Sequence, residues 1–183
     1  MINRFLAFLF IVLLSPVFVI ISLLILIEDG FPFFFLQKRV GINYTFFNIY
    51  KFRSMKKNAP NVATHLLNNP DQYLLKIGNF IRKTSLDELP NLINIIKGEM
   101  VFVGPRPALY NQDDLITLRI ATGVSKLKPG ITGWAQINGR DDISIEKKVQ
   151  LEQEYMYNRS TLFDIKIIIK TFTNVLFIKG VSH

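Results

Sequence analysis

Residues 5–27 read FLAFLFIVLLSPVFVIISLLILI, a run of apolar side chains that only Ser15, Pro16 and Ser22 interrupt. An α-helix needs about 20 consecutive apolar residues to cross the hydrocarbon core of a bilayer, so this stretch has the composition of a membrane-embedded helix. A cleaved signal peptide fits less well, because the run is long and no small-residue cleavage pattern follows it. We therefore expect the segment to lie in lipid.

The Ser15-Pro16 pair lies near the middle of this stretch and predicts a bend. Proline lacks a backbone N–H and clashes with the carbonyl four residues earlier, while the serine hydroxyl can bond to a backbone group that the bend frees. Two arrangements satisfy this chemistry: a kinked helix that spans the membrane, and a re-entrant hairpin that enters and leaves by the same face. Residue chemistry alone favours the spanning helix, since prolines are common in transmembrane helices.

The charge of the chain indicates on which side of the membrane the remainder lies. Its 22 Lys and Arg residues outnumber its 14 Asp and Glu residues, the formal net charge is +8, and every basic residue except Arg4 follows the apolar stretch. Basic residues gather on the cytoplasmic side of membrane segments, so both arrangements place the remainder in the cytoplasm. Hydrophobic residues make up 49% of the chain, which excludes a disordered polycation. We expect a membrane-embedded segment at 1–29 and one globular domain at 30–183.

The residue types that are present limit the chemistry. Cys is absent, which excludes disulfides, thiolate metal sites and a cysteine nucleophile. The two histidines, His65 and His183, lie far apart in the chain, which argues against a His-rich zinc site and a Ser-His-Asp triad. Catalysis is left to carboxylates, cations, hydroxyls and a hard metal ion.

Local patterns predict a mixed α/β domain after the apolar stretch. Residues 30–70 combine basic and aromatic side chains without Asp or Glu, a composition that suits anionic headgroups or nucleic acid, and the adjoining apolar stretch favours the membrane. Strands are expected at 44–52 and 100–103, and a Gly-rich loop at 128–140. Gly98 is expected to end a helix. The expected helices lie at about 71–83, 85–97, 113–126, 143–157 and, with an amphipathic pattern, 164–178.

The stretch RKTSLDELP at residues 82–90 is the most informative one for chemistry. Its structural interpretation is a capping box, in which Ser85 and Glu88 satisfy the first amides of a helix, and for this stretch alone that interpretation is favoured. Its functional interpretation is that Asp87 and Glu88 stand at a helix N-terminus, which also attracts phosphate. One carboxylate could then attack a phosphoanhydride while the other holds Mg²⁺.

Two further stretches carry groups that suit phosphates and nucleosides. The turn GPRP holds Arg106 between Pro105 and Pro107, which lowers the entropy that its guanidinium loses when it grips a phosphate; the alternative is a rigid surface turn. The later stretch PGITGWAQINGR offers Trp134 for stacking and Arg140 for an anion. The common glycine-rich nucleotide motifs are absent from the sequence.

Taken together, these stretches resemble the small monotopic phosphoglycosyl transferases, the bacterial initiating sugar transferases. The likeness covers nearly the whole chain through Ser15-Pro16, QKRVG at 37–41, KFRSM at 51–55, RKTSLDELP at 82–90, KGEM at 97–100, VGPRP at 103–107 and PGITGWAQINGR at 129–140. The resemblance implies transfer of a sugar-1-phosphate from a UDP-sugar donor to a polyprenyl phosphate acceptor, with Mg²⁺ as cofactor and UMP released. It also implies that the Ser15-Pro16 helix is re-entrant, which reverses the preference for a spanning helix.

On this resemblance we expect a membrane-associated, mixed α/β fold: an N-terminal re-entrant helix and a small cytosolic globular domain with amphipathic interfacial helices, on the cytoplasmic face of the bacterial inner membrane. Asp87 is expected to attack the donor and carry a phosphosugar ester, and Glu88 to bind Mg²⁺. The expected substrate-binding residues are Arg82, Arg106 and Arg140 on phosphate oxygens, and Pro105, Pro107 and Trp134 beside the uridine.

Two functions of other classes are compatible with parts of the sequence. A membrane-anchored adaptor that binds anionic lipid without catalysis explains the first third of the chain. A nucleic-acid binder explains the charge, but it has no need of Asp87, and we expect no nucleic-acid partner. The chain also departs from the family where Arg4-Phe5 stands in place of a basic pair followed by Phe-Asp, which leaves the expected catalytic residues untouched.

Overall fold

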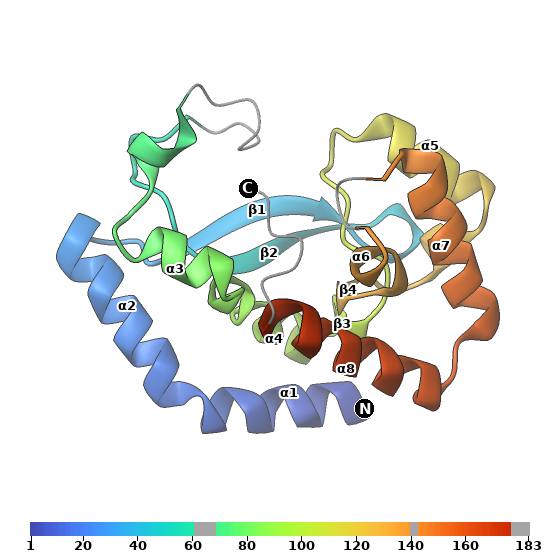
Figure 1. Ribbon diagram of the computed structural model, residues 1–183, viewed down its shortest axis with the longest axis horizontal. Helices are drawn as coiled ribbons and strands as arrows, with labels where there is room; N and C mark the ends of the chain where they lie inside the picture. The colour runs from blue at the N-terminus through green and yellow to red at the C-terminus, as the bar shows by residue number, and fades with distance from the viewer. Residues whose placement is uncertain (61–68, 140–142, 177–183) are drawn as a thin grey trace.

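The computed structural model describes residues 1–60, 69–139 and 143–176. Two N-terminal helices run beneath two small sheets, and further helices flank these sheets (Figure 1). The expected mixed α/β architecture is therefore confirmed.

The apolar N-terminal stretch forms two helices that meet at a sharp bend. Helix α1 (Ile2–Leu13) and helix α2 (Ser15–Asp29) are bent by 63° relative to one another. The Ser15 hydroxyl donates to the Val12 carbonyl at 2.8 Å, and Pro16 lies in the first turn of α2, where its missing N–H leaves no bond unmade. The predicted bend at Ser15-Pro16 is confirmed.

Among the described residues, no single helix is both long enough and apolar enough to cross a bilayer. The pair α1 and α2 passes this test when the two are taken together, across the bend.

Two small sheets form the centre of the domain. The strands are β1 (Phe34–Val40), β2 (Phe46–Phe52), β3 (Val101–Val103) and β4 (Gly130–Thr132). Strands β1 and β2 are antiparallel and are joined through the 3₁₀ helix η1 (Ile42–Tyr44), whereas β3 and β4 are parallel. The expected strands at 44–52 and 100–103 correspond to β2 and β3. Strand β4 was expected to be part of a loop.

The helices agree with the predicted ranges at the C-terminal end and differ elsewhere. The remaining elements are η3 (Pro70–Tyr73), α3 (Gly78–Lys83), η4 (Leu86–Glu88), α4 (Asn91–Lys97), α5 (Asp113–Ala121), η5 (Val124–Lys126), α6 (Trp134–Ile137), α7 (Ile145–Asn158) and α8 (Thr161–Leu176). The helix expected at 71–83 is divided because Leu74 is extended and forms a bridge with Met55. The helix expected at 113–126 is divided at Gly123, which has a left-handed φ of 78°.

The capping box expected at Ser85 and Glu88 is wrong. Ser85 has a left-handed φ of 57° and makes no side-chain cap bond, and the carboxylates lie in the 3₁₀ turn η4 rather than in an α-helix. Helix α4 begins only at Asn91, after Pro90. Its predicted end is confirmed, because Gly98 is the C-cap with a φ of 83°.

Each N-terminal helix buries one face against the domain. Ala7 of α1 is fully buried with Ile95 of α4, and Ile25 of α2 packs in a cluster with Phe52 of β2. The outer faces are equally apolar but exposed, through Phe5, Phe8, Leu9, Val12, Leu13, Val19, Ile20, Leu23, Leu24 and Ile27. An exposed apolar surface of this extent is typical of contact with lipid or another protein.

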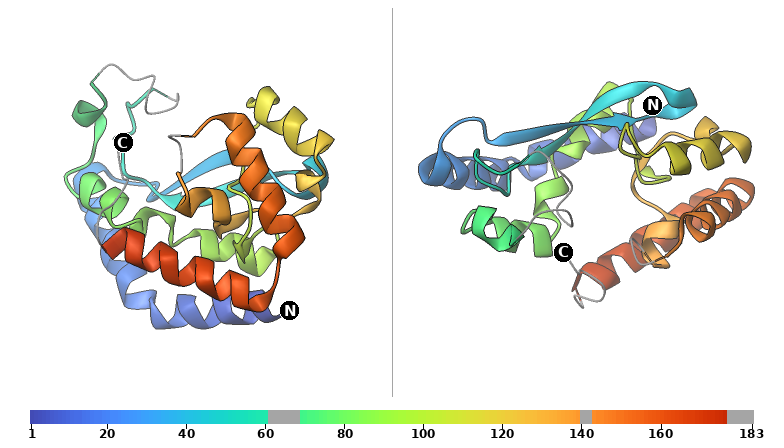
Figure 2. Two further views of the ribbon diagram at one scale, coloured as in Figure 1. Left: turned by 45° about the vertical axis from the view of Figure 1, so that its right-hand side comes forward. Right: turned by 90° about the horizontal axis from the view of Figure 1, so that it is seen from above.

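Helix α8 also exposes apolar side chains. It runs along the lower edge of the structure, as α1 does, in Figure 1 and in the left view of Figure 2. Its exposed large side chains are Leu162, Ile165, Ile169 and Phe172. The amphipathic pattern expected at 164–178 is confirmed as far as residue 174, and the helix itself extends to Leu176, where the described residues end.

Arg53 fixes the end of α2 to the first sheet. Its guanidinium pairs with the Asp29 carboxylate and donates to the carbonyls of Gly30 and Pro32, each at 2.6 Å. The hydrogen bond from Arg53 holds the pKa of Asp29 below its usual value. Because Arg53 is buried directly after β2, the bent helix pair and the sheet form one connected unit.

The second sheet depends on two backbones that approach each other without side chains. A Cβ atom on Gly130 would lie 2.1 Å from the Gly104 nitrogen. The Gly104 N–H donates to the Thr132 carbonyl, and the Gly130 N–H donates to the Pro105 carbonyl, both at 2.9 Å. Glycine at these positions therefore allows β4 to hold the turn that follows β3.

We predict that Gly130→Ala lowers the free energy of unfolding by about 3 kcal/mol or more, because its methyl group meets backbone that cannot rotate away. Gly123→Ala is the matched control, since a Cβ atom there meets nothing within 4 Å and only the left-handed backbone is strained, at a cost of about 1 kcal/mol. Thermal unfolding of both variants measures the difference. Equal losses would show that the contact with Gly104 is not tight.

Candidate active site

The adjacent carboxylates Asp87 and Glu88 lie in the η4 turn between α3 and α4. The left-handed Ser85 begins this turn, and its carbonyl accepts from the Glu88 N–H at 3.2 Å. A 3₁₀ turn has three residues per turn, so the two neighbouring side chains point in different directions. The two carboxylates consequently meet different surroundings.

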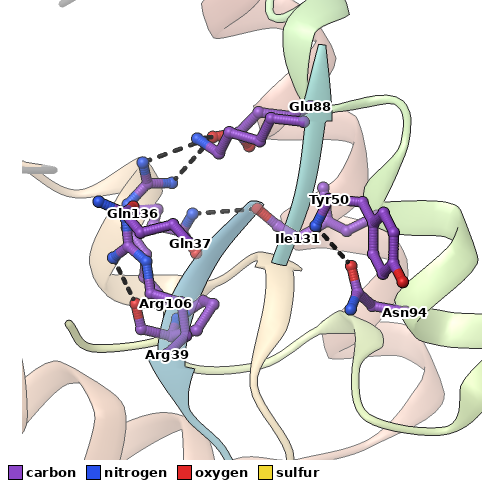
Figure 3. A network of polar contacts seen from close by, with 10 residues as sticks. Gln37, Arg39, Tyr50, Glu88, Asn94, Arg106, Ile131 and Gln136 are labelled. Carbon is purple, nitrogen blue, oxygen red and sulfur yellow. Dashed lines mark hydrogen bonds and ion pairs between the residues drawn. The ribbon is translucent and has the colours of Figure 1, made fainter. Parts of the chain in front are cut away.

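Glu88 is held by two basic side chains from distant parts of the chain. The Lys51 Nζ lies 2.7 Å from the Glu88 Oε1. Both terminal nitrogens of Arg106 lie 3.4 Å from the same oxygen, as Figure 3 shows. Burial opposes ionisation of Glu88, but the charges of Lys51 and Arg106 outweigh it and hold its pKa below the usual range. Glu88 therefore carries a negative charge throughout the physiological pH range.

Asp87 has the opposite tendency. Burial raises its pKa to about 6, the negative charge of Glu88 adds to the rise, and the positive charges of Lys51, Arg82 and Arg106 oppose it. Two adjacent carboxylates whose pKa values move apart are typical of catalytic acid, base or nucleophile pairs. Above about pH 6, Asp87 is ionised in a site that solvates it poorly.

Arg82 lies in the last turn of α3, close enough to Asp87 for their charges to interact. Burial lowers the pKa of its guanidinium, and the charges of Asp87 and Asp71 counteract this. The structure thus brings Arg82, Arg106 and the two carboxylates into one electrostatic cluster, as expected from the sequence.

The turn that carries Arg106 is rigid, and it points its guanidinium at Glu88. The Pro105 carbonyl accepts from the Gly130 N–H at 2.9 Å, and the Pro107 carbonyl accepts from Arg39 at 3.0 Å (Figure 3). The alternative of a rigid surface turn is therefore half right, because the turn is rigid but both prolines are buried. A pocket beside Glu88 is lined by Arg39, Ile49, Lys51, Glu88, Asn91, Met100, Arg106, Pro107, Gly130 and Ile131.

The structure does not bring every expected residue to this pocket. Trp134 packs on Phe163, with ring centroids 4.9 Å apart, and the amines of Lys166 and Lys170 lie over its ring at 5.8 and 5.5 Å. Pro105 lines a separate apolar pocket rather than the one beside Glu88. The expected site residue Arg140 lies outside the described residues.

Lys51 and Asn91 are among the pocket residues that were not singled out from the sequence. Lys51 belongs to the stretch KFRSM, but only the fold reveals that this residue of β2 pairs with Glu88 of η4. Asn91 is 1% exposed, and its Oδ1 has no hydrogen-bond partner in the described part of the chain. Nothing in the sequence distinguishes such an amide from any other asparagine in a helix.

The Glu88 carboxylate is the residue of this site that fits the expected Mg²⁺. Within the described ranges, no group of three or more His, Asp or Glu side chains could hold a metal ion. Mg²⁺ commonly takes only one or two carboxylates and completes its shell with water and substrate phosphates. Glu88 provides one such hard oxygen donor.

Comparison with known proteins decides the family. Residues 1–178 match the bacterial sugar transferase family. The chain belongs to this family. Its expected status as an enzyme, a sugar transferase, is confirmed, and so is the resemblance seen in its motifs.

Three relatives show how far the similarity of this sugar transferase extends. It is 44% identical over 158 residues to the uncharacterized sugar transferase EpsL of Bacillus subtilis, which covers 86% of the chain and 76% of EpsL. It is 36% identical to the exopolysaccharide production protein ExoY of Rhizobium meliloti, over 92% of the chain and 80% of ExoY. It is 41% identical to the UDP-glucose:undecaprenyl-phosphate glucose-1-phosphate transferase of Escherichia coli, over 91% of the chain but only 37% of that longer protein.

For the transferase, we predict that substitutions at the two carboxylates change stability in opposite directions. Asp87→Asn removes a charge that burial disfavours and should raise the free energy of unfolding at pH 7.5 by about 2 kcal/mol. Glu88→Gln leaves Lys51 without its partner and should lower it by a similar amount.

The pH dependence follows from the sign of the Asp87 shift. Its pKa is about 6 in the folded protein and near 3.8 when unfolded, so the folded protein takes up this proton first as the pH falls. The advantage of Asp87→Asn is therefore complete above about pH 6 and lost below about pH 4. Thermal unfolding of both variants across this range is the measurement, and an advantage that persists at pH 4 would contradict the assignment.

Proposed function

We propose that this sugar transferase moves a sugar-1-phosphate from a UDP-sugar to polyprenyl phosphate, through a covalent phosphosugar ester on Asp87. The observation that carries the proposal is the separation of the two carboxylates into a permanently charged Glu88 and an Asp87 of raised pKa, surrounded by Lys51, Arg82 and Arg106. The names of several relatives support the substrate classes, since the Escherichia coli enzyme is named for UDP-glucose and undecaprenyl phosphate and a Salmonella typhimurium relative for undecaprenyl phosphate and galactose.

In the first half-reaction, the Asp87 carboxylate attacks the β-phosphorus of the UDP-sugar. A bond forms between a carboxylate oxygen and phosphorus, the bond from that phosphorus to the bridging oxygen breaks, and UMP leaves with the bridging oxygen. Covalent catalysis divides one transfer into two, so the soluble donor and the lipid acceptor never need to be bound together. Asp87 is in the required ionised form above about pH 6.

The basic side chains stabilise the charge that accumulates on the phosphates. Lys51 and Arg106 are fixed beside the nucleophile by Glu88, so they need no reorganisation when the donor binds. Arg82 approaches from α3 and offers further positive charge. When bound, Mg²⁺ would offset phosphate charge and stabilise the leaving UMP, with Glu88 as its protein ligand.

In the second half-reaction, an oxygen of polyprenyl phosphate attacks the phosphorus of the ester. The bond to Asp87 breaks, the carboxylate is regenerated, and polyprenyl diphosphosugar is released. The acceptor is a lipid, so the site must lie near a membrane surface. The exposed apolar faces of α1, α2 and α8 support a position of the 30–183 domain against the cytoplasmic face of the bacterial inner membrane. Residues 1–29 would then be re-entrant in the bilayer.

We predict that incubation with a UDP-sugar in the absence of acceptor places one phosphosugar on Asp87. Asp87→Asn should prevent this adduct and reduce UMP release by about a thousandfold or more, because the nucleophile is gone. Glu88→Gln should keep a weak adduct and lower the rate with a reduced response to Mg²⁺. Mass spectrometry of the intact protein and a panel of UDP-sugars assayed for UMP test both variants.

An adduct on the Asp87→Asn protein would contradict the nucleophile. Failure of every UDP-sugar to yield UMP on addition of polyprenyl phosphate would instead favour the non-catalytic adaptor that binds anionic lipid.

We also predict that the bend at Ser15-Pro16 keeps both ends of the N-terminal pair on one side of the membrane. A single cysteine at Asn3 can be labelled without interference, because the chain has no Cys. In the unmodified protein, an impermeant reagent should reach it only from the cytoplasmic side. Replacing Ser15 by Leu and Pro16 by Ala restores the missing N–H and a continuous apolar helix of more than about 20 residues, so the label should move to the opposite side and activity should fall.

A label that is accessible from outside in the unmodified protein would replace the re-entrant arrangement with an ordinary spanning helix. Ser22→Leu, in the same apolar stretch, is the matched control and should leave the label on the cytoplasmic side.

A further inference from the structure

A buried ion pair lies behind the turn that carries Arg106. Arg119 of α5 and Glu152 of α7 are joined by two parallel bonds, from Nε to Oε2 at 2.8 Å and from Nη2 to Oε1 at 2.5 Å. The side chains are 10% and 2% exposed. Neither residue belongs to the pocket beside Glu88.

Stability alone gives little reason for such a pair. Removing two charges from water costs several kcal/mol per ion, and well-packed apolar residues in their place are often as stabilising or more so. The further hydrogen bonds that such a pair makes to its surroundings are therefore a more informative guide to its role. In this protein, the Arg119 Nη2 also donates to the backbone carbonyl of Arg106 at 3.0 Å.

This bond completes a regular arrangement around the turn. Proline has no N–H, so carbonyl oxygens are the main backbone groups by which Pro105, Arg106 and Pro107 can be held. Each of the three carbonyls has a different partner: the Gly130 N–H of β4, the Arg119 guanidinium of α5 and the Arg39 guanidinium of β1. The Arg106 carbonyl is the middle one, and it belongs to the residue whose side chain reaches Glu88.

We propose that Arg119 is a positioning residue that, held by Glu152, fixes the Arg106 carbonyl so that the Arg106 guanidinium stays directed at Glu88 and at the donor phosphates. The role assigned to the phosphates rests on the proposed function, whereas the geometry of the turn does not. Arg119 contacts the turn only through backbone, so it acts through Arg106 and not on the substrate.

The test replaces the ion pair by apolar residues of similar size, Arg119→Met with Glu152→Leu. We expect thermal stability to be kept within a few degrees. Because the Arg106 carbonyl loses its partner, hydrogen exchange at the Gly130 amide, which donates to the Pro105 carbonyl of the same turn, should become at least tenfold faster. The kcat/KM for UMP release should fall about 10- to 100-fold.

A second background distinguishes positioning from a general structural effect. If Arg119 acts through Arg106, the same double substitution in an Arg106→Ala protein should cause no further loss of kcat/KM, because the residue to be positioned has lost its side chain. An equal loss in both backgrounds would overturn the proposal. So would unchanged exchange and unchanged kcat/KM in the folded double variant.

Two further variants keep the test decisive. If the double variant does not fold, Arg119→Lys is the alternative. It retains the charge opposite Glu152, but one ammonium nitrogen replaces the planar pair Nε and Nη2 and cannot reproduce both parallel bonds to Glu152 together with the bond to the Arg106 carbonyl, so it should fold and show the same loss; full activity there would overturn the proposal. Gln150→Ala, at an exposed position on α7, is the control and should behave as the unmodified protein. If the unmodified protein releases no UMP at all, the proposed function fails, while the exchange measurement still decides the positioning.

Discussion

The site depends on the ion pairs that Glu88 forms with Lys51 and Arg106. Glu88 is the point at which β2, the η4 turn and the turn after β3 meet, through Lys51 and Arg106. Without it, two cations would face each other across a partly buried pocket. With it, both cations bind one shared carboxylate oxygen, and the neighbouring Asp87 is left in surroundings that raise its pKa. Glu88 thus binds both cations, and Asp87 remains as the carboxylate of raised pKa.

Helices α5 and α7 and strand β4 hold the turn that carries Arg106 in place. Helix α7 reaches both β3 and the turn that follows it. Glu152 acts through Arg119 on the Arg106 carbonyl of the turn, whereas the Tyr155 hydroxyl lies 3.1 Å from the Val103 carbonyl of β3 and 2.7 Å from Asp164. On the other side, β4 approaches closely because Gly104 and Gly130 lack side chains. Catalytic geometry is sensitive to displacements of about 1 Å, so bracing from several elements is what such a site requires.

The sequence predicted those features that local chemistry controls. The bend needs only Pro16, and the end of α4 needs only a residue such as Gly98 that adopts a left-handed backbone. The sequence-based prediction was wrong where residues far apart in the chain determine the local structure. Ser85 and Glu88 have the spacing of a capping box, yet Lys51 and Arg106, far away in the chain, draw Glu88 into a 3₁₀ turn. Likewise, Trp134 is taken up by packing on Phe163, which no local pattern could indicate.

The ion pair between Arg53 and Asp29 bears on how deep the proposed membrane segment lies in lipid. A helix that crosses a bilayer must match its thickness, and a mismatch is relieved by tilting or by deforming the lipid. If the bent pair is seated in one leaflet, its depth is set instead by the angle at Ser15-Pro16 and by the attachment of α2 to β2 through Arg53. The height of the reactive carboxylate above the headgroups would then be a property of the protein, largely independent of acyl-chain length.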